Sequence, residues 1–295
     1  MSSNGSEGVG ERRAWQARAS GESGLLLRWT ELPGVELLRA DFRNHAFVPH
    51  WHDSYMIGTS AHGAERLRHG GAERLVRPGT LTTLNPGELH DGEAEDPETG
   101  WHFRVLYCSE ESVAGVARAR GLTSGAEFRF EQVILDHKLA AHVFLEMHRG
   151  LESAISRLEL ESHFSVGMAR ILDYAGTKGE CNPEPGMCRG PLGRARDYLH
   201  EAWARPVSLE ALAEVAGLSR YHLLRTFRKQ FGLPPHAYQM QLRVVRAKEL
   251  LFNGIAAKDV ALEVGFYDQA HLTNALRRYT GVTPGRVWQH GLVQA

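Results

Sequence analysis

Hydrophobic and polar residues follow one pattern in the first part of the chain and another in the second. Up to about residue 130, short apolar runs are broken by Gly and Pro, which is typical of short β-strands. Strands this short and evenly spaced favour a small β-barrel or sandwich over a fold that alternates strands and helices. The predicted strands are Leu25–Trp29, Val35–Phe42, Tyr55–Ser60, Glu65–His69, Glu73–Val76, Thr80–Leu84 and Trp101–Tyr107.

Further along the chain, apolar residues recur at spacings of three and four, which indicates amphipathic helices. Two predicted helices, Asp136–Leu151 and Ser153–Ala175, follow the strands and are expected to pack on them. Residues 176–190 contain several Gly and Pro residues and little periodicity, so we expect a linker there. Beyond the linker, Pro191–Trp203 opens a helical domain and Pro235–Phe252 is its long central helix.

The helical domain contains one helix-turn-helix pattern twice. The first copy occupies residues 212–229, and the second follows about 49 residues later at residues 260–278. Each copy has a glycine between its two helices, Gly217 or Gly265, which can take the left-handed conformation that ends a helix. A repeated unit of this kind can read two successive stretches of a DNA major groove.

The second helix of each copy begins after a good N-cap residue, Ser219 or Asp268, whose oxygen can accept from a free amide. Each of these helices also carries two apolar residues four positions apart, which lie on one face and are expected to be buried. The two pairs are Leu223 with Phe227, and Leu272 with Leu276.

The opposite face of each second helix is expected to meet DNA. Arg can form two hydrogen bonds with guanine, Gln and Asn with adenine, and small apolar groups can contact the thymine methyl. The residues on this face are Arg220, Tyr221, Leu224, Arg225, Arg228, Gln269, Ala270, Thr273, Asn274 and Arg277. Contacts to phosphates, which position a protein without reading sequence, are expected from Lys229, Arg243, Arg246, Lys248 and Arg278. The alternative, that these are ordinary solvated faces, is weakened because both copies carry matching caps and glycines.

The C-terminal hundred residues resemble the DNA-binding domain of the AraC/XylS family of bacterial transcription regulators. The resemblance is carried by Leu209–Ala213, Gly265–Leu272 and Gly281–Gly285. Two positions depart from the family pattern, in which Arg commonly replaces Asn274 and Phe replaces Leu276. Asn274 removes a charge from a position expected to contact bases, so the base preference of the second copy is in question.

A looser resemblance covers the first domain, from about Trp29 to Tyr107. His50-Trp51-His52 together with the turn, strand and turn of Arg77–Asp91 resemble the cupin-like effector-binding barrel of many AraC-type regulators. The resemblance implies that a small-molecule effector binds inside this barrel. It also implies that part of the following helix pair could form a homodimer interface.

His50, His52 and His90 are the candidate effector-binding residues with the clearest chemistry. They could hydrogen-bond an organic effector, hold a metal ion or serve the structure alone, since imidazole both donates and accepts and also ligates metals. We expect these histidines to hydrogen-bond an organic effector and not to hold a metal. Metal-binding cupins also use a glutamate ligand, and Glu65 lies too far along the chain to match its position. Further candidates for the lining of the pocket are Tyr55, Glu88 and Arg104.

Charge separates the two halves of the chain. From Pro191 onward 14 Lys and Arg accompany 8 Asp and Glu, whereas the preceding residues carry 20 against 27, for a net charge of −1 overall. A basic second domain suits a polyanion such as DNA, although chance asymmetry is an alternative. No apolar run approaches the roughly 18 residues that span a membrane, and no export signal follows Arg12-Arg13. Three cysteines give no disulfide framework, so we expect the cytoplasm.

The expected fold class is α+β: a cupin-like β-barrel with a helix pair, then an all-α domain with two helix-turn-helix motifs. The expected division is a disordered tail (1–24), an effector-binding and dimerisation domain (25–175), a linker (176–190) and a DNA-binding domain (191–295). The expected function is a sequence-specific transcription regulator that binds double-stranded DNA and a small-molecule effector, with no enzymatic activity and no cofactor. The alternative is a metal-dependent cupin enzyme fused to a DNA-binding module.

Overall fold

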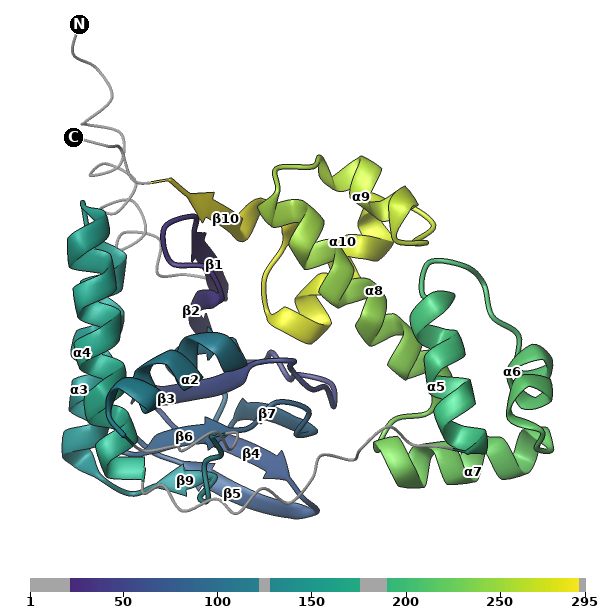
Figure 1. Ribbon diagram of the computed structural model, residues 1–295, viewed down its shortest axis with the longest axis horizontal. Helices are drawn as coiled ribbons and strands as arrows, with labels where there is room; N and C mark the ends of the chain where they lie inside the picture. Colours follow the sequence, from purple (N-terminus) through teal and green to yellow (C-terminus); the bar gives the residue numbers. More distant parts are fainter. Residues whose placement is uncertain (1–21, 122–127, 176–189, 292–295) are drawn as a thin grey trace, which may run out of the picture.

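The computed structural model describes residues 22–121, 128–175 and 190–291 (Figure 1). Strands and three helices form an N-terminal β-domain, and six further α-helices form a C-terminal helical domain beside it. The predicted α+β class is confirmed. The predicted linker and most of the predicted tail lie outside the described residues, although strand β1 already begins at Ser23. Within the described residues, no helix combines the length and apolar character needed to cross a bilayer.

The β-domain contains two sheets. The larger has the strand order β10-β1-β2-β8-β3-β6-β9, and the smaller has the order β5-β4-β7. No strand pairing closes the two into one barrel among the described residues. The strands are β1 (Ser23–Trp29), β2 (Val35–Phe42), β3 (Tyr55–His62), β4 (Glu65–His69), β5 (Ala72–Val76), β6 (Leu81–Leu84), β7 (His90–Ala94), β8 (Trp101–Cys108), β9 (Ile134–Leu135) and β10 (Val287–His290).

All seven predicted strands are present, each within two residues of its predicted bounds. Their apolar positions explain why they form: Leu37, Ile57 and Leu106 are fully buried and lie on β2, β3 and β8, in the middle of the large sheet. Strands β7, β9 and β10 were not predicted. Two of the three are short, and β7 carries Gly92 between acidic residues, so none has a strong apolar signature.

Helices α2 (Glu110–Ala119), α3 (Lys138–Ser153) and α4 (Arg157–Ala175) belong to the β-domain, and α3 and α4 flank it in Figure 1. Their buried side chains share one core with the large sheet, in which Phe144 and Ile171 are fully buried. The predicted helix pair is therefore present. Its break falls at residues 154–156 instead of residue 152, because the first helix runs on to Ser153.

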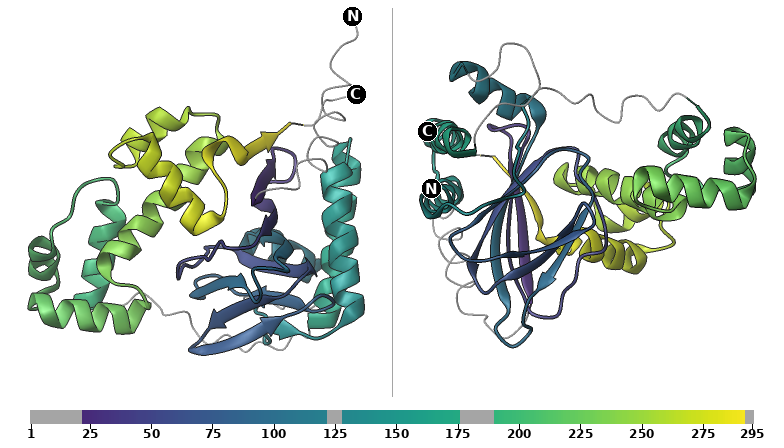
Figure 2. Two further views of the ribbon diagram at one scale, coloured as in Figure 1. Left: turned by 180° about the vertical axis from the view of Figure 1, so that it is seen from behind. Right: turned by 90° about the horizontal axis from the view of Figure 1, so that it is seen from below.

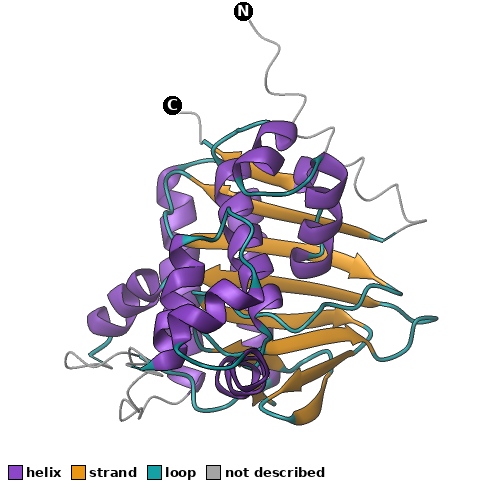
Figure 3. Cartoon of the chain, turned by 90° about the vertical axis from the view of Figure 1, so that its right-hand side faces the viewer, coloured by secondary structure: helices purple, strands orange, loops and turns teal. Residues whose placement is uncertain are grey.

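The helical domain consists of α5 (Pro191–Glu201), α6 (Leu209–Ala216), α7 (Arg220–Phe231), α8 (Pro235–Phe252), α9 (Ala257–Glu263) and α10 (Gln269–Thr280). The pairs α6–α7 and α9–α10 are the two predicted helix-turn-helix units, and α8 has its predicted bounds and joins them. In the view of Figure 3, these helices stand in front of the strands of the β-domain.

The second helix-turn-helix unit shares its core with the β-domain. Leu38 and Phe42 of β2 belong to the same buried cluster as Leu276 and Tyr279 of α10. Beyond α10, strand β10 pairs in parallel with β1, in the register Leu26↔Val287 (Figure 2). The first unit has a core of its own around Leu223 and Phe227. The six helices of the helical domain all lie after the boundary expected at residue 191. Strand β10 also lies after this boundary, but it belongs to the sheet of the β-domain.

Candidate functional site

The turns of both helix-turn-helix units have the predicted geometry. The hydroxyl of Ser219 accepts from the amide of His222, and the carboxylate of Asp268 accepts from the amide of His271 at 2.7 Å. Gly217 and Gly265 have φ angles of 68° and 80°, a left-handed conformation that glycine adopts without strain. The caps and turns therefore set the direction of α7 and α10 as the sequence predicted.

The two predicted faces of α7 and α10 are also separated in the structure. Leu223, Phe227, Leu272 and Leu276 each have 0% of their surface exposed. On the opposite faces Thr273 is partly exposed, and its hydroxyl donates to the carbonyl of Gln269. The other residues expected to contact DNA are all exposed: Arg220, Tyr221, Leu224, Arg225, Arg228, Lys229, Gln269, Ala270, Asn274, Arg277 and Arg278.

Two of these arginines have acidic partners within the chain. Arg220 pairs with Glu210 of α6 at 2.5 Å, and Arg277 pairs with Glu22 at 3.1 Å. Both arginine side chains remain more than half exposed. Pairs this open to water are weak, so each arginine can exchange its partner for a phosphate or a base.

Two basic residues on α8 that the sequence assigned to phosphates have structural roles instead. The Arg243 guanidinium donates to the carbonyls of Trp203 and Gly265, each at 2.8 Å, and so holds the turn of the second unit. Lys248 is directed at the β-domain, where it pairs with Glu36. Both side chains lie on faces of α8 that pack against other parts of the protein. The spacing of the basic residues along α8 did not indicate which of them would face inward.

A cavity of about 30 Å³ lies between the two sheets of the β-domain. Aromatic rings form much of its wall, and Trp101 and Phe103 stack with their centroids 4.0 Å apart. Polar side chains also face it, of which Thr82 and Trp101 have buried polar atoms without a partner in the described part of the chain. The remaining lining residues are Phe47, His50, Met56, Gly58, Thr59, Glu65, His90, Gly92, Val105 and Tyr107.

The structure brings the three candidate histidines together beside this cavity. Their ligand nitrogens all lie within 4.8 Å of one another. His50 and His90 are 4% and 5% exposed, and they exchange two backbone hydrogen bonds of 2.9 Å. His52 lies next to both rings and against Tyr107, at a centroid distance of 4.5 Å. The residue between, Trp51, points to the helical domain, as alternation along an extended segment predicts.

Glu65, which the sequence placed too far along the chain, lines the same cavity as two of the histidines. Strand β4 pairs with β7 in the register His69↔His90 and Glu65↔Ala94, which carries the acid to the cavity wall. Burial, with the nearby charge of Asp91, raises the pKa of Glu65 to about 8, so the carboxyl is mainly protonated at neutral pH. Glu65 therefore lies at the cavity although its distance along the sequence indicated otherwise, because the pairing of β4 with β7 brings it there.

The three further candidates lie elsewhere. Tyr55 donates to the carbonyl of Phe128 within the core beneath α3. The Glu88 side chain accepts from the Asn85 amide nitrogens at 3.0 Å and pairs with His69. None of Tyr55, Glu88 or Arg104 is among the described residues that line the cavity.

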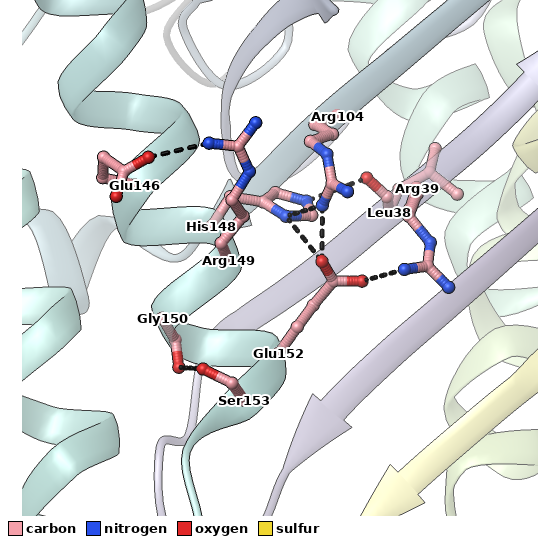
Figure 4. A network of polar contacts seen from close by, with 9 residues as sticks. All are labelled: Leu38, Arg39, Arg104, Glu146, His148, Arg149, Gly150, Glu152 and Ser153. Carbon is pink, nitrogen blue, oxygen red and sulfur yellow. Dashed lines mark hydrogen bonds and ion pairs between the residues drawn. The ribbon is translucent and has the colours of Figure 1, made fainter. Parts of the chain in front are cut away.

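Arg104 belongs to a polar network between the large sheet and α3 (Figure 4). It pairs with Glu152 at 2.5 Å, and Arg39 pairs with the other oxygen of the same carboxylate at 2.8 Å. His148, which is fully buried, contacts both Glu152 and Arg104 and lies 3.2 Å from the carbonyl of Leu38. Arg104 therefore fastens α3 to the sheet instead of lining the pocket.

The two segments that carry the histidines also touch the helical domain. Gln241 of α8 donates to the carbonyl of Trp51 at 2.6 Å, and the Trp51 ring lies 5.9 Å from that of Tyr238. Leu89, next to His90, packs so closely on Gly232 that a Cβ on this glycine would overlap it. These contacts were not predictable, because nothing in Gln241 or Leu89 indicates a partner so far along the chain.

Two family models match the chain: residues 32–166 match the "AraC-like ligand binding domain" and residues 212–290 match a "Helix-turn-helix domain". The chain is 30% identical to the uncharacterized HTH-type transcriptional regulator YbfI of Bacillus subtilis, over 77% of this chain and 81% of that protein. It is 33% identical to the HTH-type transcriptional activator RhaS of Escherichia coli, over 82% of this chain and 88% of that protein.

Among solved structures, an apo form of a point variant of ToxT from Vibrio cholerae superimposes with a TM-score of 0.54 at 13% identity, over 85% of this chain and 96% of ToxT. This similarity supports the fold. The relatives that cover most of the chain are transcription regulators and not enzymes. The chain therefore belongs to the AraC family of transcription regulators, with an AraC-like ligand-binding domain followed by a DNA-binding helix-turn-helix domain.

Proposed function

We propose that this protein is a sequence-specific transcription regulator whose binding to DNA responds to an effector held in the β-domain. The observation that carries the proposal is the contact between the two parts. Two segments beside the cavity carry the histidines. The segment of His50 and His52 touches α8 through Trp51, and the segment of His90 touches the end of α7 through Leu89. A ligand that moves these two segments would therefore alter the contacts that position the first helix-turn-helix unit.

The exposed faces of α7 and α10 supply the DNA-reading part of the proposal. They carry Arg225, Gln269 and Asn274, whose side chains match the edges of guanine and adenine. Arg228, Lys229 and Arg278 are exposed nearby and suit phosphates. For the effector part, support comes from a solved ToxT structure with a bound unsaturated fatty acid, which matches this chain with a TM-score of 0.50.

Two further features belong to the proposal. The outer face of the α3–α4 pair exposes Leu139 and Val166, which are 48% and 61% accessible, and we propose that a second copy of the chain packs there. The compartment we propose is the cytoplasm, where the protein would reach its DNA.

The experiment is selection of binding sites by the full chain from a random DNA library, followed by titration of the selected site at several salt concentrations. We expect one enriched motif and a steep loss of affinity with salt, because phosphate contacts release counterions. Arg157→Ala is the matched control, since Arg157 is an exposed arginine on α4 paired with Glu161. Absence of an enriched motif, or equal losses in Arg157→Ala and Arg225→Ala, contradicts the proposal.

A further inference from the structure

Three imidazoles converge beside the cavity of the β-domain, on segments that also contact the helical domain. The ring centroids of His50 and His90 are 4.4 Å apart, and those of His50 and His52 are 4.8 Å apart. Their ligand nitrogens lie within 4.8 Å of one another, although no ion-paired acid holds any of the three rings among the described residues.

Hydrogen bonds determine which nitrogen is free in two of these rings. Nδ1 of His50 lies 2.8 Å from the carbonyl oxygen of Val48, and Nδ1 of His90 lies 2.9 Å from that of Glu88. Because a carbonyl oxygen only accepts, each Nδ1 carries the proton and each Nε2 keeps its lone pair. Proteins orient metal-binding histidines with the same kind of hydrogen bond.

His52 contributes a third nitrogen, which lacks a hydrogen-bond partner among the described residues. Its Nε2 is buried and finds no hydrogen-bond partner in the part of the chain that the structure describes. A buried polar atom left in this state destabilises a fold, and native proteins usually satisfy such atoms with a ligand, an ion or water.

The cavity beside the rings has room for an ion. Its volume of about 30 Å³ accommodates about one or two water molecules. Glu65 on the cavity wall is a buried carboxyl whose ionised form a nearby cation would favour.

We propose that His50, His52 and His90 bind one divalent first-row transition-metal ion, and that this ion is the effector that the β-domain detects. Imidazole nitrogens suit Zn²⁺, Cu²⁺, Ni²⁺ and Fe²⁺. Metal binding stands on the geometry of the three rings alone, whereas the regulatory role rests on the proposed function above.

The geometry also indicates how the ion would act on the helical domain. Nitrogens that bind one tetrahedral ion at about 2.0–2.1 Å lie about 3.3 Å apart, so the ion would draw together ligand nitrogens that now lie up to 4.8 Å apart. His50 and His52 flank Trp51, which Gln241 of α8 holds. His90 follows Leu89, which packs on Gly232 at the end of α7. Contraction of the cluster therefore shifts both contacts that hold the first helix-turn-helix unit.

The test uses the full chain, freed of metal with a chelator and titrated with Zn²⁺ and, separately, with Co²⁺, whose visible absorption reports its coordination. We expect one ion per chain, bound about 100-fold or more weaker by His90→Asn and by His52→Asn. In His90→Asn the amide nitrogen can still donate to the carbonyl of Glu88, whereas the ligand nitrogen is lost. Thermal melting of each metal-free variant checks that it is folded.

His62→Ala is the matched control. His62 is exposed and His102 is half-buried on the same domain; their ring centroids lie 5.5 Å apart, and the pair could hold an adventitious ion. We expect His62→Ala to bind metal like the wild type. On the operator that the full chain selects, Zn²⁺ should change DNA affinity about tenfold or more in the wild type and in His62→Ala, but not in His52→Asn.

Less than one ion per folded wild-type chain overturns the proposed site, and so does stoichiometric binding that survives in His90→Asn or disappears in His62→Ala. Stoichiometric binding that leaves DNA affinity unchanged overturns the role of the ion as effector. Failure of the proposed function gives a different result, because no form of the protein would then select a DNA sequence with or without metal.

Discussion

The ammonium nitrogen of Lys248 lies 2.8 Å from a carboxylate oxygen of Glu36, and this ion pair joins α8 to β2 across the domain boundary. Burial alone would lower the pKa of Lys248, but the charge and the hydrogen bond of Glu36, together with the charges of Asp53 and Glu249, outweigh burial and raise it, so the ammonium stays charged. Arg28 and Glu249 form a second pair between the same domains, at 2.7 Å. The domains are thus joined by charges as well as by their shared core.

Removing one partner of the buried pair should destabilise the protein. Lys248→Met leaves the Glu36 carboxylate, 12% exposed, without its counter-charge. Loss of one partner of such a pair costs about 3–5 kcal/mol of the free energy of unfolding. Urea denaturation at pH 7 measures this loss. Glu36→Gln combined with Lys248→Met should recover most of it, and a double variant as unstable as the single one would contradict the assignment.

Acid should weaken the network around Glu152. Burial alone would raise the pKa of this carboxyl, but the neighbouring His148 and the charges of Arg104 and Arg39 outweigh burial and lower it to about 2. Because the folded pKa lies below the unfolded value, the ionised group stabilises the fold above about pH 4.5, and this contribution is lost as the pH falls toward 2.

Glu152→Gln should therefore lower the free energy of unfolding by about 2–3 kcal/mol at pH 7, with a difference from the wild type that shrinks below pH 4.5. Urea denaturation between pH 7 and pH 3 measures both curves. Parallel curves over this range would mean that Glu152 does not titrate as its surroundings indicate. Glu146→Gln is the control, since Glu146 pairs with Arg149 on an exposed part of the same helix.

Arg225 and Lys229 should affect DNA binding in different ways. Arg225→Ala should cost about 1–3 kcal/mol on the selected operator and relax the preference at one base pair, as expected for a lost bidentate contact. Lys229→Ala should weaken binding to all sequences about equally and reduce the salt dependence. Site selection with each variant measures the difference. Identical selection profiles would show that the division into base and phosphate contacts is wrong.

A side chain at Gly232 should destabilise the fold. Its φ angle is +73°, and a Cβ would overlap Leu89 of the β-domain. Gly232→Ala should lower the free energy of unfolding by about 1–2 kcal/mol through the backbone alone, and further through the clash. Leu89→Ala in the same chain should relieve only the clash, so thermal melting should show partial recovery. Full additivity of the two substitutions would place Leu89 away from this contact.

Local patterns predicted most of the elements. The caps Ser219 and Asp268, the glycines between the helices and the apolar pairs of α7 and α10 act within a few residues, so the sequence displays them directly. Strand β7 was missed because its pairing depends on β4, which carries Glu65 to the cavity. Its own sequence has too few apolar residues to stand out.

The site was harder to predict than the fold. His50 and His52 could be expected to face one interior because they alternate along an extended segment, and their proximity to His90 agrees with the resemblance. Arg104 and Tyr55 were misplaced among the candidates, because alternation along a strand does not say which face points to the cavity and which to α3. Lys248 was misjudged for a similar reason, since its partner Glu36 lies 212 residues away.

The pairing of β10 with β1 has a consequence for folding during synthesis on the ribosome. Leu26 pairs with Val287, so β1 receives this neighbour only after residue 287 has left the ribosome. At about 5–20 residues per second, the outer edge of β1 would stay unpaired for roughly 13 to 52 seconds after β1 is made. An open edge of this kind recruits strands from other chains. Slow decoding of the codons between α4 and β10 should therefore raise the fraction of nascent chains that aggregate, even though every other strand of the large sheet has by then been made.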